Sequence, residues 1–193
     1  MITLANMRKR NTISHALLNT SKAHILLLQE PWYDRISTTR CDDACEGIDV
    51  LGGVTSPAWD IHYPIAKPDQ RPKVMAYVWK TINAKSNNPL PFLVISHPDI
   101  CAHPCIQVLD IIHPRERWRI LNFYHDIRDK SCLETLLALD LKVTTPTLII
   151  GDFNTHSRSW SPKNIETSCW ARKLEEWAVG NLLTLANNPG TIT

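Results

Sequence analysis

The chain has 193 residues, 44% of them hydrophobic and 21% charged, which is typical of one globular domain, so we expect a single domain over 1–193. The formal net charge of +2 excludes the strongly basic composition of a dedicated nucleic-acid-binding protein, although it is compatible with a local basic patch. No stretch approaches the roughly 18 apolar residues of a membrane helix, and Met1 to Arg10 lack the pattern of a signal peptide. We expect an intracellular, monomeric protein without membrane contacts.

The first part of the chain predicts a strand, a helix and a second strand. Apolar runs at 2–5 and 25–28 predict the strands, and helical spacing over 13–21 predicts the helix between them. Pro31 disfavours helix at Glu30 and cannot donate to a sheet, so Glu30 lies at the end of a buried strand. From residue 35 to 73, prolines and paired glycines predict irregular loops broken by short strands.

The rest of the chain alternates further strands with two helices. Apolar runs, mostly separated by proline-bearing turns, predict strands at 74–79, 92–95, 106–112, 118–124, 147–150 and 182–186. Apolar residues share one helical face at 131–141 and again at 168–179. This order fits two sheets packed face to face with helices outside.

Two carboxylates, Glu30 and Asp152, each follow a buried apolar run. Strand ends that converge on one edge of a sheet are common ligand sites, and two carboxylates there can hold Mg²⁺, which prefers oxygen ligands. A solvated turn residue or a helix cap is the plainer interpretation for either carboxylate alone. Together they favour metal-assisted cleavage of a phosphate ester.

Two segments resemble signature motifs of the endonuclease/exonuclease/phosphatase family: Leu28-Gln29-Glu30-Pro31-Trp32 and Ile150-Gly151-Asp152-Phe153-Asn154-Thr155-His156. Shorter similarities cover Asn6 after the first strand, 71–74 (Arg-Pro-Lys-Val) and 122–124 (Asn-Phe-Tyr), so the resemblance spans nearly the whole chain. The segment from His156 to Trp160 resembles the endonuclease domain of non-long-terminal-repeat retrotransposons. The resemblance implies a four-layer α/β sandwich of the deoxyribonuclease I-like type that nicks DNA.

The resemblance also implies the roles of individual residues. Glu30 and Asp152 would bind Mg²⁺, with Mn²⁺ as an alternative, and Asp152 would orient or deprotonate the attacking water. Tyr124 would stabilise charge on the phosphate, a role that suits a preorganised hydroxyl donor. Asn154 would contact the scissile phosphate or orient its neighbours, and Asn6 would help to position the acidic cluster. Three further residues would contact the DNA substrate: Arg71, His156 and Arg158.

The chain departs from the family pattern in two places. No Ser-Asp-His motif follows Asp152, and Glu175 and Glu176, beside a helical stripe, are expected to be solvated rather than to replace it. We therefore expect a sandwich that lacks its last strands, incomplete at the C-terminus, with activity reduced on the order of 10²- to 10⁴-fold. His125 stands where the family often has Asn or Pro, a change expected to affect substrate contacts more than the fold.

Three other interpretations stay open. The same chemistry serves phosphatases or phosphodiesterases that act on small phosphorylated molecules. The spacings of Cys41 with Cys45, and of Cys101 with Cys105, are compatible with a zinc-binding module, although free thiols are the expectation. A non-catalytic remnant could bind nucleic acid through Arg8, Lys9, Arg10, Arg115, Arg117 and Arg119, of which the last three are expected on the wet face of a strand. A nuclear location is implied only by the retrotransposon resemblance.

Overall fold

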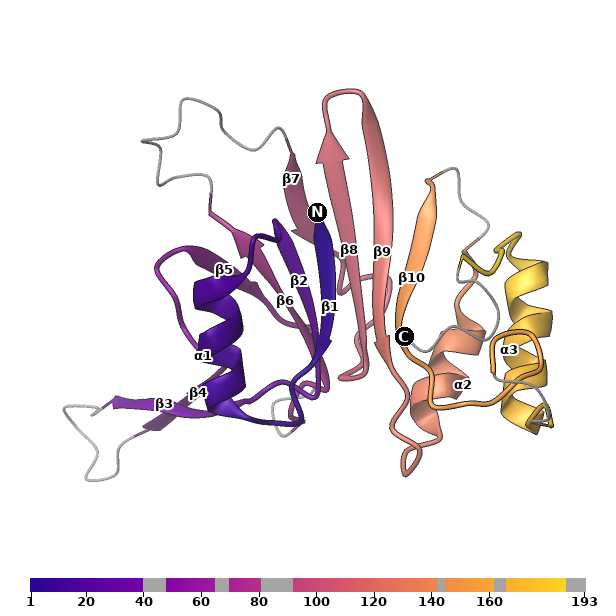
Figure 1. The fold of residues 1–193 in the computed structure, drawn as a ribbon, viewed down its shortest axis with the longest axis horizontal. Coiled ribbons are helices and arrows are strands. Elements are labelled where there is room, and N and C mark those ends of the chain that lie inside the picture. Colours follow the sequence, from indigo (N-terminus) through magenta and orange to yellow (C-terminus); the bar gives the residue numbers. More distant parts are fainter. Residues whose placement is uncertain (40–47, 65–69, 81–91, 142–144, 162–165, 187–193) are drawn as a thin grey trace.

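Two four-stranded sheets form the centre of the computed structural model, which describes residues 1–193 except 40–47, 65–69, 81–91, 142–144, 162–165 and 187–193 (Figure 1). The first sheet has the order β1 (Ile2–Asn6), β2 (Ile25–Gln29), β6 (Val74–Trp79) and β5 (Trp59–His62). The second has the order β10 (Thr147–Asp152), β9 (Glu116–Tyr124), β8 (Ile106–His113) and β7 (Leu93–Ser96). A separate hairpin pairs β3 (Asp34–Thr39) with β4 (Ile48–Gly52). The short strands expected between 35 and 73 are therefore confirmed.

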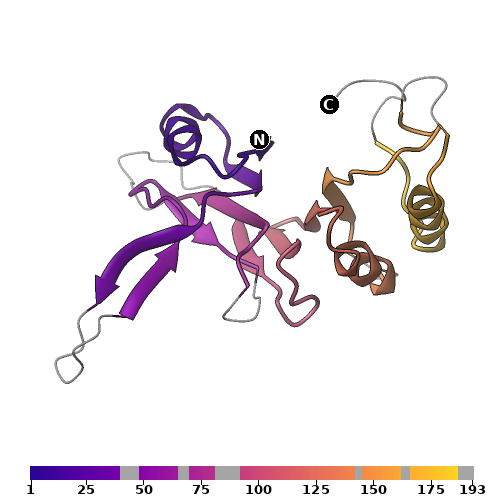
Figure 2. The same cartoon turned by 90° about the horizontal axis from the view of Figure 1, so that it is seen from below.

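Three helices cover the outer faces of the sheets, on opposite sides of the sandwich (Figure 2). The helix α1 (Asn11–Thr20) packs Leu18 on the first sheet, and the indole of Trp59 donates to the Leu18 carbonyl at 3.0 Å. On the second sheet lie α2 (Ser131–Ala138) and α3 (Cys169–Gly180). Between the sheets, residues of β2 and β6 pack on β8 and β9, and this explains why all five residues of β2 are buried. In the described part of the chain no helix is long and apolar enough to cross a membrane.

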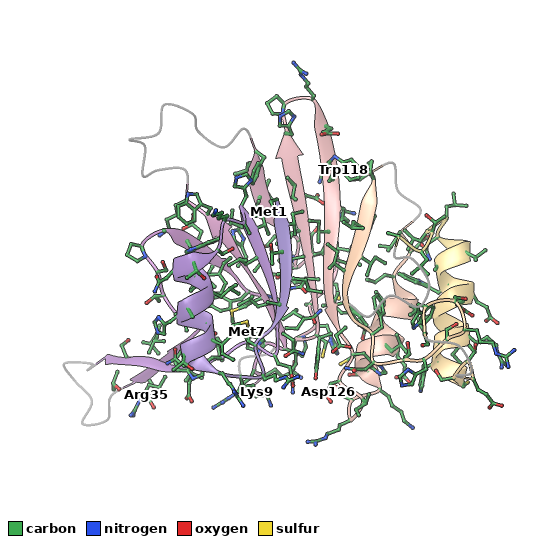
Figure 3. The ribbon with its side chains drawn as sticks, in the orientation of Figure 1. Met1, Met7, Lys9, Arg35, Trp118 and Asp126 are labelled. Carbon is green, nitrogen blue, oxygen red and sulfur yellow. The ribbon has the colours of Figure 1, made fainter. Side chains whose placement is uncertain are left out.

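The strand directions bring four carboxyl ends to one rim of the sandwich. The pair β1–β2 is parallel, with Asn6 opposite Gln29, and the pair β9–β10 is parallel, with Tyr124 opposite Asp152. All four strands run toward the lower end in Figure 1. In Figure 3, Lys9 and Asp126 lie at this end and Trp118 lies at the other. The ends of the two motif strands therefore share one rim of the sandwich, although β2 and β10 belong to different sheets.

Buried amides connect the two sheets across their inner faces. The side chain of Gln29 donates to the Phe123 carbonyl at 2.8 Å, and that of Asn122 donates to the Met75 carbonyl at 3.1 Å. Both side chains are at most 2% exposed, so each bond forms without competing water. A buried carbonyl left without its donor costs about 1–3 kcal/mol, which makes these bonds sensitive to the spacing of the sheets.

The expected strand at 182–186 is wrong. Leu182 instead adopts a left-handed turn conformation with φ of 58°, and its N–H donates to the Val179 carbonyl at the end of α3. The apolar residues that suggested a strand are largely exposed, with Leu182 at 87% and Leu185 at 52%. This segment is rich in apolar residues, but the end of α3 and the turn that follows it determine the backbone conformation here.

The expected wet face is confirmed for Arg115 and Arg117, which are exposed, and is wrong for Arg119. Arg119 is 8% exposed, and its guanidinium binds the fully buried carboxylate of Asp110 on β8, with Nε to Oδ1 at 2.9 Å. Arg117 also donates to Asp110. Burial raises the pKa of Asp110, but the hydrogen bonds from Arg119 and Arg117 outweigh this and lower it overall. Arg119 thus neutralises a buried charge from within the structure, whereas Arg117 reaches the same carboxylate from the surface, with 47% of its side chain exposed.

We expect Gly151→Ala to destabilise the protein strongly. A Cβ on Gly151 would overlap the carbonyl of its neighbour Phe123 on β9, which is backbone and cannot rotate away. The matched control is Gly180→Ala, because a Cβ there meets nothing within 4 Å. Urea unfolding should show a loss of about 3 kcal/mol for the first variant and less than about 0.5 kcal/mol for the second. Equal stability of the two variants would contradict the close approach of β9 and β10.

Candidate active site

Glu30 stands at the end of β2 in a backbone conformation that few non-glycine residues adopt, with φ of 45°. Its N–H donates to the Lys73 carbonyl at 2.9 Å, and its carbonyl accepts the N–H of Lys9 at 2.8 Å. Main-chain bonds on both sides therefore hold Glu30 in this conformation. The turn directs the chain out of the sheet where the carboxylate can face the rim.

Tyr124 meets Glu30 across the junction of the two sheets. The Glu30 carboxylate lies close enough to the phenol to raise its pKa, which places the end of β9 beside the end of β2. Burial raises the pKa of Tyr124 strongly, and the negative charges of Glu30, Asp126 and Asp152 raise it further. The phenol therefore stays protonated and is available as a hydrogen-bond donor.

Asp152 begins a tight turn that carries Asn154. The Asp152 carboxylate accepts the Asn154 N–H at 3.1 Å, an arrangement that favours the left-handed φ of 43° at Asn154. The Asn154 side-chain amide donates to the His125 carbonyl at 2.8 Å, and the His125 N–H donates to the Asp152 carbonyl at 2.8 Å. The β9 and β10 exits are thus bound to each other directly beside the two candidate catalytic groups.

The expectation that His125 affects substrate contacts more than the fold is wrong. The His125 side chain is only 5% exposed, and its Nδ1 lies 2.8 Å from the Phe153 carbonyl oxygen. This bond ties the loop after β9 to the loop after β10. His125 therefore positions the segment that carries Asp152 and Asn154, and it does so from beneath the surface.

Lys73 and Asp126 form an ion pair at the rim that the sequence motifs did not single out. Lys73 Nζ lies 3.0 Å from Asp126 Oδ2, and this contact joins the entry of β6 to the loop after β9. Burial raises the pKa of Asp126, but the hydrogen bond from Lys73 outweighs burial and lowers it overall. Asp126 lies two residues after Tyr124, and this closeness to a motif is the sequence feature that could have identified it.

The remaining predicted residues lie in exposed places. Asn6 is exposed at the end of β1, and its side-chain oxygen accepts the Arg8 N–H at 3.0 Å. Arg71 pairs with Asp34 at 3.9 Å, so this guanidinium is partly neutralised. His156 and Arg158 are exposed in the loop that follows β10. Glu175 is not solvated as expected, because it accepts the hydroxyls of Ser157 and Ser159 and so ties this loop to α3.

Three carboxylates lie around Tyr124 at the rim. Glu30, Asp126 and Asp152 all lie close enough to Tyr124 to raise its pKa. In the described ranges these three do not converge within 4.8 Å of one another. Glu30 and Asp152 could therefore hold an ion that takes its other ligands from water and phosphate, as Mg²⁺ commonly does.

The sequence matches the model of the endonuclease/exonuclease/phosphatase family over residues 3–172. The chain belongs to this family. A solved structure, the endonuclease domain of TRAS1, a telomere-specific non-LTR retrotransposon, matches with a TM-score of 0.67 and 18% identity over 97% of this chain and 73% of that chain. No curated protein sequence matches significantly. The deoxyribonuclease I-like sandwich predicted from the motifs is therefore confirmed, and family and fold indicate a hydrolase of phosphodiester bonds.

We expect Lys73→Met to lower the free energy of unfolding by about 1–2 kcal/mol at neutral pH, because Asp126 is only 19% exposed and would lose its cation. The folded pKa of Asp126 lies below its unfolded value of about 3.9. The stabilisation is therefore complete above that unfolded value and is lost as the pH falls through the folded pKa. The difference between wild type and variant should shrink between about pH 5 and pH 2.

Lys80→Met is the matched control for this prediction. Lys80 is as exposed as Lys73, at 32%, but its partner Asp60 is 57% exposed and 3.5 Å away. Urea unfolding across the same pH range should show a loss of less than about 0.5 kcal/mol. A loss in Lys73→Met that is independent of pH, or no greater than in Lys80→Met, would contradict the role of the ion pair.

Proposed function

We propose that this protein is a Mg²⁺-dependent endonuclease that nicks DNA, of the kind found in non-LTR retrotransposons. The observation that carries the proposal is the contact between Glu30 and Tyr124, with Asp152 beside them, at the rim where β2, β9 and β10 end. These groups come from three strands and two sheets, so their meeting is a product of the fold. Family membership supports hydrolysis of phosphate esters by such a set.

Each side chain has a role that its surroundings support. Bound Mg²⁺ would supply positive charge against the phosphoryl oxygens. Glu30 would hold the ion together with Asp152, and Asp152 would accept the proton of the attacking water. The protonated Tyr124 phenol would donate to a non-bridging oxygen, where negative charge grows during the reaction. Asn154 would hold the turn that presents Asp152 and face the phosphate from the same loop.

A basic segment next to the site favours a polyanionic substrate over a small phosphorylated molecule. Arg8 and Lys9 both have positive φ, and the Lys9 N–H is bonded to the Glu30 carbonyl, so the segment borders the acidic site directly. The side chains of Arg8, Lys9 and Arg10 are exposed. Phosphates on both sides of a scissile bond can be contacted by such cations. The retrotransposon resemblance alone suggests a nuclear site of action.

We propose that these 193 residues by themselves act weakly. The Ser-Asp-His segment of the family is not found after Asp152, and His156 is exposed in its own loop. A positioned acid or stabilising imidazole contributes about 10²- to 10⁴-fold to such reactions. The specific activity should therefore be lower by this order than that of a family member carrying the segment.

Nicking of supercoiled plasmid tests the function. With Mg²⁺ the chain should convert supercoiled to open-circular DNA slowly, and Asp152→Asn should lower the rate by about 10²-fold or more. Glu30→Gln should weaken the dependence on Mg²⁺. Glu134→Gln, which changes an exposed carboxylate in the first turn of α2, is the matched control and should nick like the wild type. Nicking that survives Asp152→Asn would refute the assignment, whereas hydrolysis of p-nitrophenyl phosphate without nicking would favour the small-molecule phosphatase.

The basic segment is tested by the salt dependence of DNA binding. Changing Arg8 and Lys9 together to Ala should weaken binding and reduce the slope of log affinity against log salt by about 1.8 if both contact phosphate. The control changes Lys22 and Arg115 to Ala, because both are exposed and precede β2 and β9, at the ends of these strands that lie away from the rim. An equal slope change in the two double variants would show that DNA binds without using this rim.

A further inference from the structure

A second cluster of side chains that can bind a metal lies near the rim. Its ligand atoms are thiol sulfurs and an imidazole nitrogen instead of carboxylate oxygens. One ligand atom each from His103, Cys105 and Cys132 lies within 4.8 Å of the other two. His103 and Cys105 precede β8, and Cys132 is in the first turn of α2. The two cysteines are at most 1% exposed and both are free thiols. In the described part of the chain this is the only group of three such residues that close together.

The composition of the cluster indicates the kind of ion that it suits. Two thiols and an imidazole are soft or borderline ligands, which Zn²⁺ takes in tetrahedral sites and which Mg²⁺ avoids. Two sulfurs bound to Zn²⁺ at about 2.3 Å lie about 3.8 Å apart in a tetrahedron. The three ligand atoms lie within 4.8 Å of one another, so the side chains must move closer together to reach that geometry. Cys101, the neighbour suggested by the sequence spacing, lies outside the cluster and packs in the apolar core.

The hydrogen bonds around His103 fix the position of the imidazole. The Nδ1 lone pair accepts the Cys105 N–H at 3.2 Å, so a bound ion would take the place of this hydrogen bond. The Nε2 atom lies 3.1 Å from the Ser131 hydroxyl, which in turn donates to Asp129 at 2.6 Å. A chain from the outer ring nitrogen to a carboxylate is the usual support of a zinc-bound histidine.

The fourth position is left to water. Asp129 accepts the Ser131 hydroxyl and therefore supports His103 from the outer shell, and it is not among the residues whose ligand atoms lie within 4.8 Å of one another. Water can complete four-coordination.

We propose that His103, Cys105 and Cys132 bind one Zn²⁺ that joins the entry of β8 to the start of α2. The site would support the loop from Tyr124 to Ser131 from beneath, because the Cys105 carbonyl also accepts the Tyr124 N–H at 3.0 Å. This role is structural and separate from the oxygen-liganded rim. The inference does not depend on the proposed nuclease activity.

The experiment is a metal titration of the full chain, reduced and stripped of metal, with Co²⁺ as a spectroscopic probe and Zn²⁺ in competition with a chromophoric chelator. The parent carries Cys41→Ser and Cys45→Ser, because these two residues lie outside the described ranges and could bind metal themselves. One equivalent of Co²⁺ should give a thiolate charge-transfer band and the visible bands of a tetrahedral site. Zn²⁺ should then displace the Co²⁺ and raise the melting temperature.

Variants of the cluster and its surroundings separate the outcomes. Cys132→Ser and His103→Ala should each lower affinity by at least about 100-fold, because outer-shell changes alone cost about 10- to 100-fold. Ser131→Ala should weaken binding about tenfold without changing the thiolate band. Because Ser131 is not a ligand, this variant shows an effect on affinity that loss of the fold in the ligand variants cannot explain. Cys101→Ser, a buried thiol outside the cluster, should bind like the parent. No thiolate band with Co²⁺, equal binding by Cys132→Ser and Cys101→Ser, or recovery of a Cys105–Cys132 disulfide from chain that binds no metal when reduced would overturn the proposal.

Discussion

The site depends on two buried amides that set the two sheets against each other. Gln29 donates from β2 to a carbonyl of β9, and Asn122 donates from β9 to a carbonyl of β6. The residue after Gln29 is Glu30, and the residue two after Asn122 is Tyr124, so the amides lie immediately beneath the contact between carboxylate and phenol. Apolar packing alone would tolerate a small slide of one sheet over the other, whereas a buried hydrogen bond does not. The amide hydrogen bonds thus fix the register between the two sheets, which apolar packing alone would leave undefined.

Backbone conformation at the rim shows the same constraint. Among the described residues, five non-glycine residues have positive φ, and four of them follow strands that end here: Arg8, Lys9, Glu30 and Asn154. Such conformations cost on the order of 1–3 kcal/mol and persist only where neighbours hold them. At Glu30 and Lys9 the holding contacts are main-chain hydrogen bonds to each other and to Lys73. The residues with positive φ lie where the chain leaves the sheets and side chains can face a substrate. The rigid strands that precede them hold these unfavourable conformations in place.

Two kinds of metal chemistry would meet around one loop. The rim offers carboxylates that face water, and the cluster behind it offers buried thiols and an imidazole. A hard ion that keeps its waters suits the first, and a soft-ligand ion that gives them up suits the second. The segment from Tyr124 to Cys132 borders both, so removal of zinc by a chelator could loosen Tyr124 and Asp126 even when Mg²⁺ is restored. Chelator controls of nuclease activity should therefore add back each ion separately.

The sequence by itself determined the helices, the order of the motifs and every expected strand except the one at 182–186. The apolar run before Glu30 identifies β2, which is buried on both faces. The run before Asp152 also forms a strand, but the expectation that it is buried is wrong, because β10 is an edge strand and none of its residues is fully buried. The tertiary structure alone decided which polar residues meet. Arg119 turned from an expected surface residue into the partner of Asp110, His125 became a buried brace for the Asp152 turn, and Cys132 replaced Cys101 beside Cys105. Each of these depends on which side chains face each other across strands or loops, and local periodicity describes one element at a time, so it carries no information about the partner on the next one.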